Sequence, residues 1–143
     1  MARIEVKMPD VFMDKISRLG DKTDDIVPRV LEAGGEVALA AVRGNLQSVI
    51  GRGTKSPSRS TGELVSALGL SPAKMDKNGN FNVKVGFNEP RSGGGSNAKI
   101  ANIIEYGKHG QPPKPFLKPA KAQARTAVMA AMTAKLESEI RDV

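Results

Sequence analysis

The most constraining stretch of this sequence is a run of prolines between two segments with helical patterns. Pro112, Pro113 and Pro115 each fix φ and disfavour the helical region for the residue before them, so residues 111–116 are expected to be extended. Phe116 is one of the few large apolar residues there, and it predicts an anchor that fixes this strap (residues 107–116) to the core. The chain must therefore fold around a stiff connection.

The segment before the strap has the pattern of a helix end. Ile100, Ile103 and Ile104 recur at spacings of three and four residues, as on one face of a helix. Gly107 follows and is suited to a left-handed C-cap. Glu105 is a carboxylate at this helix end, and we expect it to fix the strap through ion pairs or hydrogen bonds rather than to act as an acid or base.

The segment after the strap predicts a long terminal helix. Pro119 suits the first turn of a helix, where its missing N–H removes no hydrogen bond. From Ala120 to about Arg141 the larger apolar residues then recur every four positions: Val128, Met132, Leu136 and Ile140.

A second long helix is expected over Asp25 to Ile50. Its apolar residues keep a 3.6-residue rhythm: Val27, Val30, Leu31, Ala38, Val42, Leu46 and Val49. Gly34 and Gly35 lie in its middle and each disfavour a helix by roughly 1 kcal/mol relative to alanine. They predict either a kink or a close contact with another helix.

Two segments have the alternation of half-buried strands. Arg3 to Met8 alternates charged with apolar residues, and Phe81 to Phe87 places Phe81, Val83, Val85 and Phe87 on one face. The Asn78-Gly79 pair predicts a hairpin turn before the second strand, and Pro72 makes the partner strand an edge. The expected fold is α+β: a small antiparallel sheet with a β-hairpin, packed against the central and C-terminal helices.

At 143 residues the chain is expected to be a single domain, residues 1–143, with mobile loops at about 51–60 and 89–97. Without cysteine it has neither a disulfide framework nor a thiolate metal site. No signal peptide is visible and no apolar run approaches the roughly 20 residues that cross a membrane, so the chain is expected to be made and kept in a cytoplasm.

The net charge of +7 is unevenly distributed. Residues 52–125 contain 13 Lys or Arg and 4 Asp or Glu, a net +9, whereas the segments on either side each have a net charge of −1. Such clustering suits nucleic acid or an acidic protein surface, and it also suits a solvated loop. Arg52, Lys55 and Arg59 are the candidate contacts with a neighbouring subunit or with DNA.

The sequence offers little for catalysis. His109 is the only histidine and stands between Lys108 and Gly110, with no nucleophile or orienting acid nearby. The loop GRGTKS at residues 51–56 lacks the glycine spacing of a nucleotide-binding P-loop. We therefore expect no enzyme activity, no catalytic residues, no cofactor and no metal.

Two motifs carry a resemblance to a known family. The first is Glu105-Tyr106-Gly107 followed by PKPFLKPA at residues 113–120, and the second is STGELVSAL at residues 60–68. Both resemble motifs of the small neck or tail-completion proteins of long-tailed bacteriophages, the gene-ten type of the lambdoid group. The structural residues that this resemblance singles out are Glu105, Tyr106, Gly107, Pro115, Phe116, Leu117 and Pro119.

The resemblance implies a structural virion protein at the neck, where heads and tails are joined. Its expected partners are further copies of itself in a hexameric ring, the neighbouring connector and tail-tube or terminator proteins, and DNA in the channel through non-specific contacts. The alternative is a small basic nucleic-acid-binding protein that contacts phosphates through residues 52–59, although few aromatic residues are present for base stacking.

Overall fold

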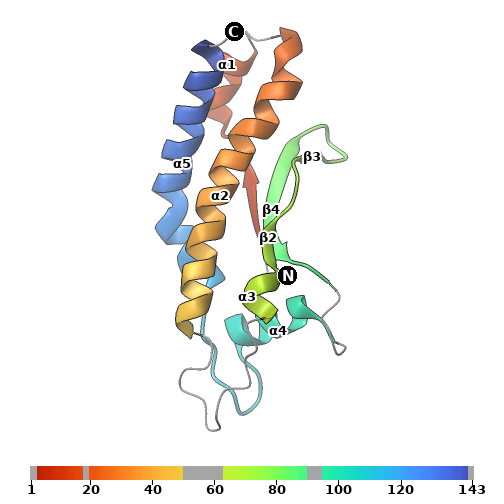
Figure 1. Ribbon diagram of the computed structural model, residues 1–143, viewed down its shortest axis with the longest axis vertical. Coiled ribbons are helices and arrows are strands. Elements are labelled where there is room, and N and C mark those ends of the chain that lie inside the picture. The colour runs from red at the N-terminus through yellow and green to blue at the C-terminus, as the bar shows by residue number, and fades with distance from the viewer. Residues whose placement is uncertain (1–2, 18–19, 50–62, 90–94, 142–143) are drawn as a thin grey trace.

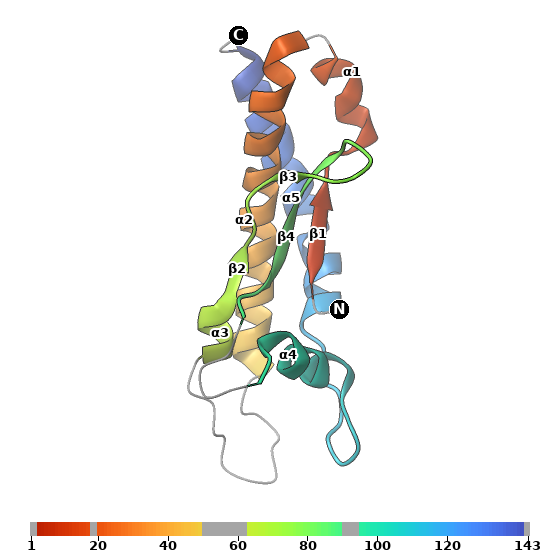
Figure 2. The same cartoon turned by 90° about the vertical axis from the view of Figure 1, so that its right-hand side faces the viewer.

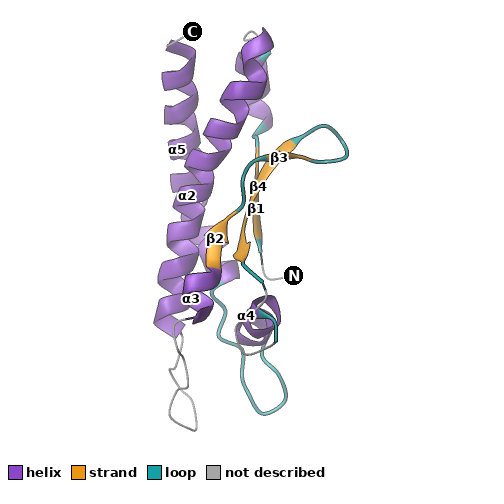
Figure 3. Ribbon diagram, turned by 45° about the vertical axis from the view of Figure 1, so that its right-hand side comes forward, coloured by secondary structure: helices purple, strands orange, loops and turns teal. Residues whose placement is uncertain are grey.

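The computed structural model describes residues 3–17, 20–49, 63–89 and 95–141. In chain order its elements are β1 (Ile4–Lys7), the 3₁₀ turn η1 (Asp10–Phe12), α1 (Met13–Ile16), the 3₁₀ turn η2 (Gly20–Lys22), α2 (Thr23–Val49), α3 (Glu63–Ala67), β2 (Leu68–Leu70), β3 (Lys74–Met75), β4 (Phe81–Phe87), α4 (Asn97–Tyr106) and α5 (Leu117–Arg141). The sheet lies against the long helix α2, and α5 runs along α2 beside it (Figure 1; Figure 3). The predicted α+β class is confirmed.

The sheet is antiparallel, with β4 as its central strand. The order is β1-β4-β2, and β3 also pairs directly with β4, at the start of that strand, whereas β2 pairs with its end. The predicted hairpin is present: the Asp76 carboxylate accepts hydrogen bonds from the backbone N–H groups of Asn78 and Asn80, at 2.8 and 3.0 Å. The partner strand is divided into β2 and β3 around Pro72 and forms an edge, as expected.

The alternation along β4 is only partly as predicted. Val83 and Val85 are fully buried, which agrees with one apolar face, but Asn82 on the other face is buried as well. Asn82 stands opposite Lys7 of β1 and Lys74 of β3. Because it has a neighbouring strand on both sides, its position in the centre of the sheet shields it from solvent.

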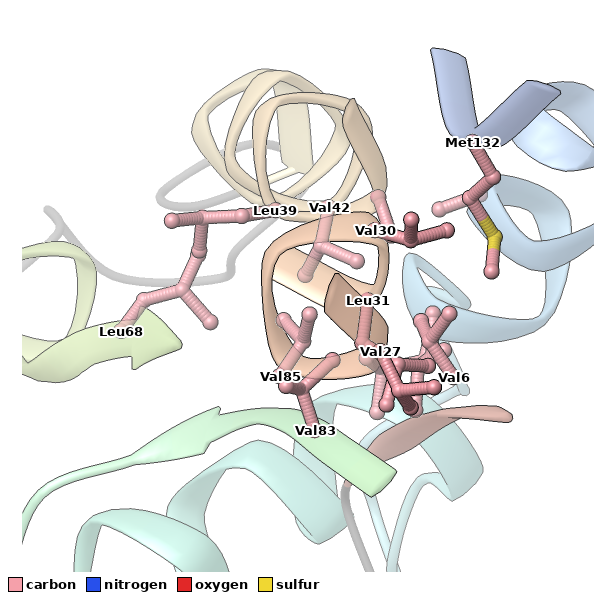
Figure 4. Close-up of a cluster of buried hydrophobic side chains, with 14 of the residues drawn as sticks. Val6, Val27, Val30, Leu31, Leu39, Val42, Leu68, Val83, Val85 and Met132 are labelled. Carbon is pink, nitrogen blue, oxygen red and sulfur yellow. The ribbon is translucent and has the colours of Figure 1, made fainter. Parts of the chain in front are cut away.

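The core lies between α2, the sheet and α5, as Figure 4 shows in a view along α2. Six of the seven residues in the predicted rhythm of α2 are buried, and Val49 is half-buried. On α5, Met132 and Leu136 are buried, while Val128 and Ile140 are half-buried. The apolar spacing of each long helix therefore predicted its buried face.

The ends of the two long helices establish that they run antiparallel. Arg29, near the start of α2, forms an ion pair with Glu139 near the end of α5, at 2.9 Å. Asn45, near the end of α2, donates a hydrogen bond to Gln123 near the start of α5, at 3.2 Å. The start of α2 and the end of α5 accordingly meet at one end of the molecule (Figure 1).

The glycine pair in α2 marks close packing on two sides. A Cβ on Gly34 would lie 2.6 Å from Cγ of Met132 on α5, and a Cβ on Gly35 would lie 2.7 Å from Cδ1 of Leu70 on β2. Gly34 thus allows the close approach of α5, and Gly35 that of the sheet. The close helix contact predicted for the pair is found at Gly34, whereas the contact of Gly35 with the sheet was not predicted.

Gly35→Ala is expected to lower the free energy of unfolding by about 1 to 2 kcal/mol, because overpacking against Leu70 and Val83 outweighs the gain in helix propensity. Gly44→Ala is the matched control in the same helix, where an added Cβ meets nothing within 4 Å. That control should raise the free energy of unfolding by about 0.5 to 1 kcal/mol. Urea denaturation measures both, and equal gains for the two variants would contradict the packing described.

Candidate functional site

The most distinctive local structure is a joint at which the end of α4, the strap and the first turn of α5 meet. The Glu105 side chain, on the last turn of α4, is 3% exposed. Its Oε1 accepts hydrogen bonds from the backbone N–H groups of Phe116 at 3.0 Å and Leu117 at 2.6 Å, and its Oε2 accepts one from Lys118 at 3.3 Å. One carboxylate therefore satisfies three N–H groups at the start of α5.

These N–H groups lack partners within their own helix, and the start of a helix attracts negative charge. Glu105 consequently acts as a cap supplied by another helix, eleven residues earlier in the chain. Hydrogen bonds to an ionised acceptor are stronger than neutral ones, and burial shields them from water. The capping contact holds α4 and α5 in one relative position.

Phe116 anchors the joint in the core. Its ring is fully buried and meets the ring of Phe87 on β4 edge to face, with the ring centroids 6.3 Å apart. Its backbone carbonyl accepts a hydrogen bond from Nδ2 of Asn45 on α2, at 3.2 Å. Phe116 therefore ties the strap to the sheet through its side chain and to α2 through its backbone, and its predicted burial is confirmed.

The strap folds back against the end of α4, and its close approach there requires glycine at position 107. Gly107 ends α4 with φ 78° and ψ 176°, so it has a positive φ but not the left-handed helical conformation expected from the sequence. A Cβ there would lie 2.8 Å from the backbone nitrogen of Pro113 and 2.9 Å from the carbonyl oxygen of Gln111. The extended ψ results from the sharp return of the strap, in which the Lys114 N–H donates to the Ile104 carbonyl at 2.7 Å.

The other residues of the predicted structural motif surround the joint without capping it. Leu117 is buried as the first residue of α5, and Pro119 lies half-buried two residues later. Pro115 is exposed, and so is Tyr106, with 70% of its surface accessible. The candidate contacts Arg52, Lys55 and Arg59 lie outside the described residues.

The start of α4 is held by a second carboxylate. Glu89 accepts hydrogen bonds from the backbone N–H groups of Ala98 and Asn97, at 2.7 and 3.1 Å, and from the Ser96 hydroxyl, at 2.8 Å. The bond from Ala98 is the largest influence that lowers the pKa of Glu89. These hydrogen bonds link Glu89, at one end of the predicted mobile segment 89–97, to residues 96 and 97 at its other end. Residues 90–94 lie outside the described part of the chain, and mobility there stays a prediction.

A groove opens between the edge strand β1 and α5, with Ala38 of α2 lining it as well. Its volume is about 690 Å³, and a second hollow shares the residues Ile4, Glu5, Lys7 and Lys121 with it. The groove is lined by small and apolar side chains of α5, including Ala120, Ala124 and Val128. Figure 2 shows β1 at the edge of the sheet, near the first turns of α5.

Basic residues border this groove, and sequence reasoning did not single them out. They come from both walls: Arg3 just before β1 and Lys7 at its end, and Lys118, Lys121 and Arg125 on α5. A sequence signal existed, because residues 118, 121 and 125 are three and four positions apart and so share one side of a helix. That Arg3 and Lys7 lie close to these three residues depends on the fold and is not indicated by sequence spacing.

The described residues hold no cluster of three or more His, Cys, Asp or Glu side chains arranged for a metal ion. His109 is exposed in the strap. Among the described helices none combines the length and the apolar character needed to cross a membrane. The features that stand out among the described residues are the joint and the groove between β1 and α5, whose lining is apolar and basic.

The fold is that of a small α+β protein. The chain belongs to the HK97-gp10-like family, described as bacteriophage HK97-gp10 and assigned as a tail component, whose family model matches residues 10–107. No curated protein and no solved structure matches the chain. The match extends from η1 to Gly107 and so includes α2, strands β2 to β4 and α4, while β1 precedes it and most of the strap and α5 follow it.

Proposed function

We propose that this chain is a tail-completion protein that joins head to tail as a closed homo-oligomeric ring at the neck of a long-tailed phage, without enzyme activity. The observation that carries the proposal is the family match over residues 10–107, which makes the chain a phage tail component. As such it acts within the virion among other virion proteins. The position at the neck and the closed ring are proposed here in addition to what the family match gives.

A ring needs subunits that keep their shape under load and that present two different complementary surfaces. The joint supports the first requirement, because Glu105 and Phe116 couple α4, α5, α2 and β4 at one end of the molecule. For the second, the basic segment 52–59 is one candidate surface. The acidic ends of the long helices are the other: Asp24, Asp25 and Glu137 are exposed there.

The nucleic-acid-binding alternative has less support. Non-specific single-strand binding uses aromatic side chains as stacking platforms along a basic groove. In the described part of the chain, Tyr106 is the one largely exposed aromatic residue, and it is not among the residues that line the basic groove. Salt-sensitive DNA binding by the isolated chain would favour this alternative over the ring.

The test is complementation of a phage that lacks the gene, with electron microscopy of the products. The unmodified chain should restore joined, infectious particles, whereas without it separate heads and tails should accumulate. Arg52→Glu, Lys55→Glu and Arg59→Glu together should leave the fold intact and reduce joined particles by about tenfold or more, because like charges then face one another across an interface.

The matched control reverses three exposed basic residues elsewhere, Lys74→Glu, Lys77→Glu and Lys99→Glu, with the same change in net charge. This control should retain joining. Full joining by the first triple variant would remove segment 52–59 from the mechanism. Normal particles in the absence of the gene would remove the proposed function itself.

A further inference from the structure

The groove between β1 and α5 has the properties of a protein-docking surface. Within the described residues, β1 pairs with β4 alone, so its other edge faces the groove rather than another strand. The α5 wall is lined by alanines, Val128 and Met129, and Met129 is 36% exposed. An apolar floor between a strand edge and a helix favours a protein partner over nucleic acid.

The charges of the groove define the partner further. Lys7, Lys118, Lys121 and Arg125 line it, Arg3 lines the adjoining hollow, and Glu5 is the one acidic residue among the described residues that line either. Glu5 lies 4.0 Å from Nζ of Lys7, whose side chain is 72% exposed, so this pair is long and solvated. The groove therefore carries an excess of positive charge and suits an acidic surface.

The same chain presents such a surface on the far side of α2. Asp25, Glu32 and Glu36 are all exposed there, and Arg29 among them is already paired with Glu139. Arg43 lies about two turns beyond Glu36. Ala40, one turn from Glu36, is exposed and small, so another helix can approach closely. We name the surface formed by Asp25, Glu32, Glu36 and Ala40 the acidic face.

Helix geometry places the groove and the acidic face on opposite sides of α2. Ala38 lines the groove, and a separation of two residues turns Glu36 and Ala40 about 160° away from it around the helix axis. The same separation moves them only about 3 Å along the axis. Glu36 and Ala40 of the acidic face thus lie level with the Ala38 position in the groove, back to back on each subunit, while Glu32 and Asp25 extend the acidic face about 9 and 20 Å toward the start of α2.

We propose that the β1–α5 groove binds the acidic face of α2 from a second copy of this chain. The proposal rests on the proposed ring function and specifies its subunit contact. Two different surfaces on opposite sides generate a head-to-tail contact, and such contacts close into a ring when the rotation between subunits divides the circle. Because Glu36 and Ala40 are level with the groove, each copy is added beside the previous one rather than above it.

Cysteine cross-linking within particles tests this contact directly. This sequence has no cysteine, so the introduced pair provides the only thiols of the chain. Ala40→Cys with Ala122→Cys places one thiol on the acidic face and one in the groove lining. These positions face opposite sides of a single chain, so a short thiol-specific cross-linker should produce dimers and larger multimers between copies.

The matched control is Ala40→Cys with Ala127→Cys. Ala127 is exposed, does not line the groove and lies about 140° around α5 from Ala122. Its chains should stay monomeric after the same treatment. Monomers from Ala40→Cys/Ala122→Cys in particles that contain the chain would overturn the contact. Absence of the unmodified chain from particles would instead overturn the ring function.

A charge exchange tests the same contact without cross-linking. Lys121→Glu with Arg125→Glu, or Glu32→Lys with Glu36→Lys, should each reduce joined particles by about tenfold or more. All four substitutions together should restore joining to within about threefold of the unmodified chain, because the attraction is restored with its signs exchanged. The proposal would be overturned if the variant with all four substitutions gave no more joined particles than the weaker of the two double variants, while its circular dichroism spectrum showed a folded chain.

Discussion

Replacing Phe116 by alanine is expected to lower the free energy of unfolding by about 3 to 5 kcal/mol. The ring is fully buried, so the substitution leaves a cavity between β4, α2 and the start of α5. It also removes the edge-to-face contact with Phe87. The strap itself is stiff, so we expect it to be unable to collapse into the space, and the cost should be near the upper part of the range.

Urea denaturation of the purified chain measures this change. Phe81→Ala is the matched control, because Phe81 is half-buried and its truncation should cost clearly less. Hydrogen exchange should also show faster exchange at the first amides of α5 in the Phe116 variant. A loss below roughly 1 kcal/mol for Phe116→Ala would show that the strap is not anchored in this way.

The second large effect is expected for Glu105→Ala, which should lower the free energy of unfolding by about 3 kcal/mol or more. Truncation leaves the N–H groups of Phe116, Leu117 and Lys118 without their shared acceptor. It also removes a negative charge from the start of α5, where that charge is favourable. The joint should loosen even though no large side chain is lost.

Glu105→Gln separates these two contributions. The amide keeps one carbonyl oxygen as an acceptor but has no charge, so its effect should lie between those of the natural residue and alanine. Glu137→Ala is the control for a carboxylate on an exposed helical surface and should change stability by less than about 0.5 kcal/mol. Equal stability of the Glu105→Ala and Glu137→Ala variants would contradict the capping role.

Local sequence rules predicted the elements well because most of them depend on short-range periodicity. The apolar rhythm of α2, the alternation in β1 and the turn at Asn78-Gly79 each involve residues close together in the chain. The proline strap was predictable for the same reason, since each proline restricts its own backbone and that of the residue before it.

The relations between elements were not predictable in this way. The sequence marked Glu105 as a residue that fixes the strap, but the three amides that it caps follow eleven to thirteen residues later, beyond any helical spacing. The glycine pair in α2 left kink and contact equally open until Met132 and Leu70 were found against it. Asn82 is buried because β4 is the central strand, which no pattern within β4 indicates.

The groove shows the same limit. Lys118, Lys121 and Arg125 form a visible basic spacing on α5, but only the fold brings Arg3 and Lys7 to the opposite wall. The sequence pointed instead to Arg52, Lys55 and Arg59, whose positions lie outside the described residues. The two basic surfaces are separate predictions, and the charge variants described above distinguish them.

The most direct measurement is an electron cryo-microscopy reconstruction of the head-to-tail junction in particles that carry this chain. The predicted result is a closed ring of copies at the neck, each with α2 and α5 antiparallel and with the acidic face of one copy in the β1–α5 groove of the next. A junction without this fold, in particles that mass spectrometry shows to lack the chain, would contradict the proposed function.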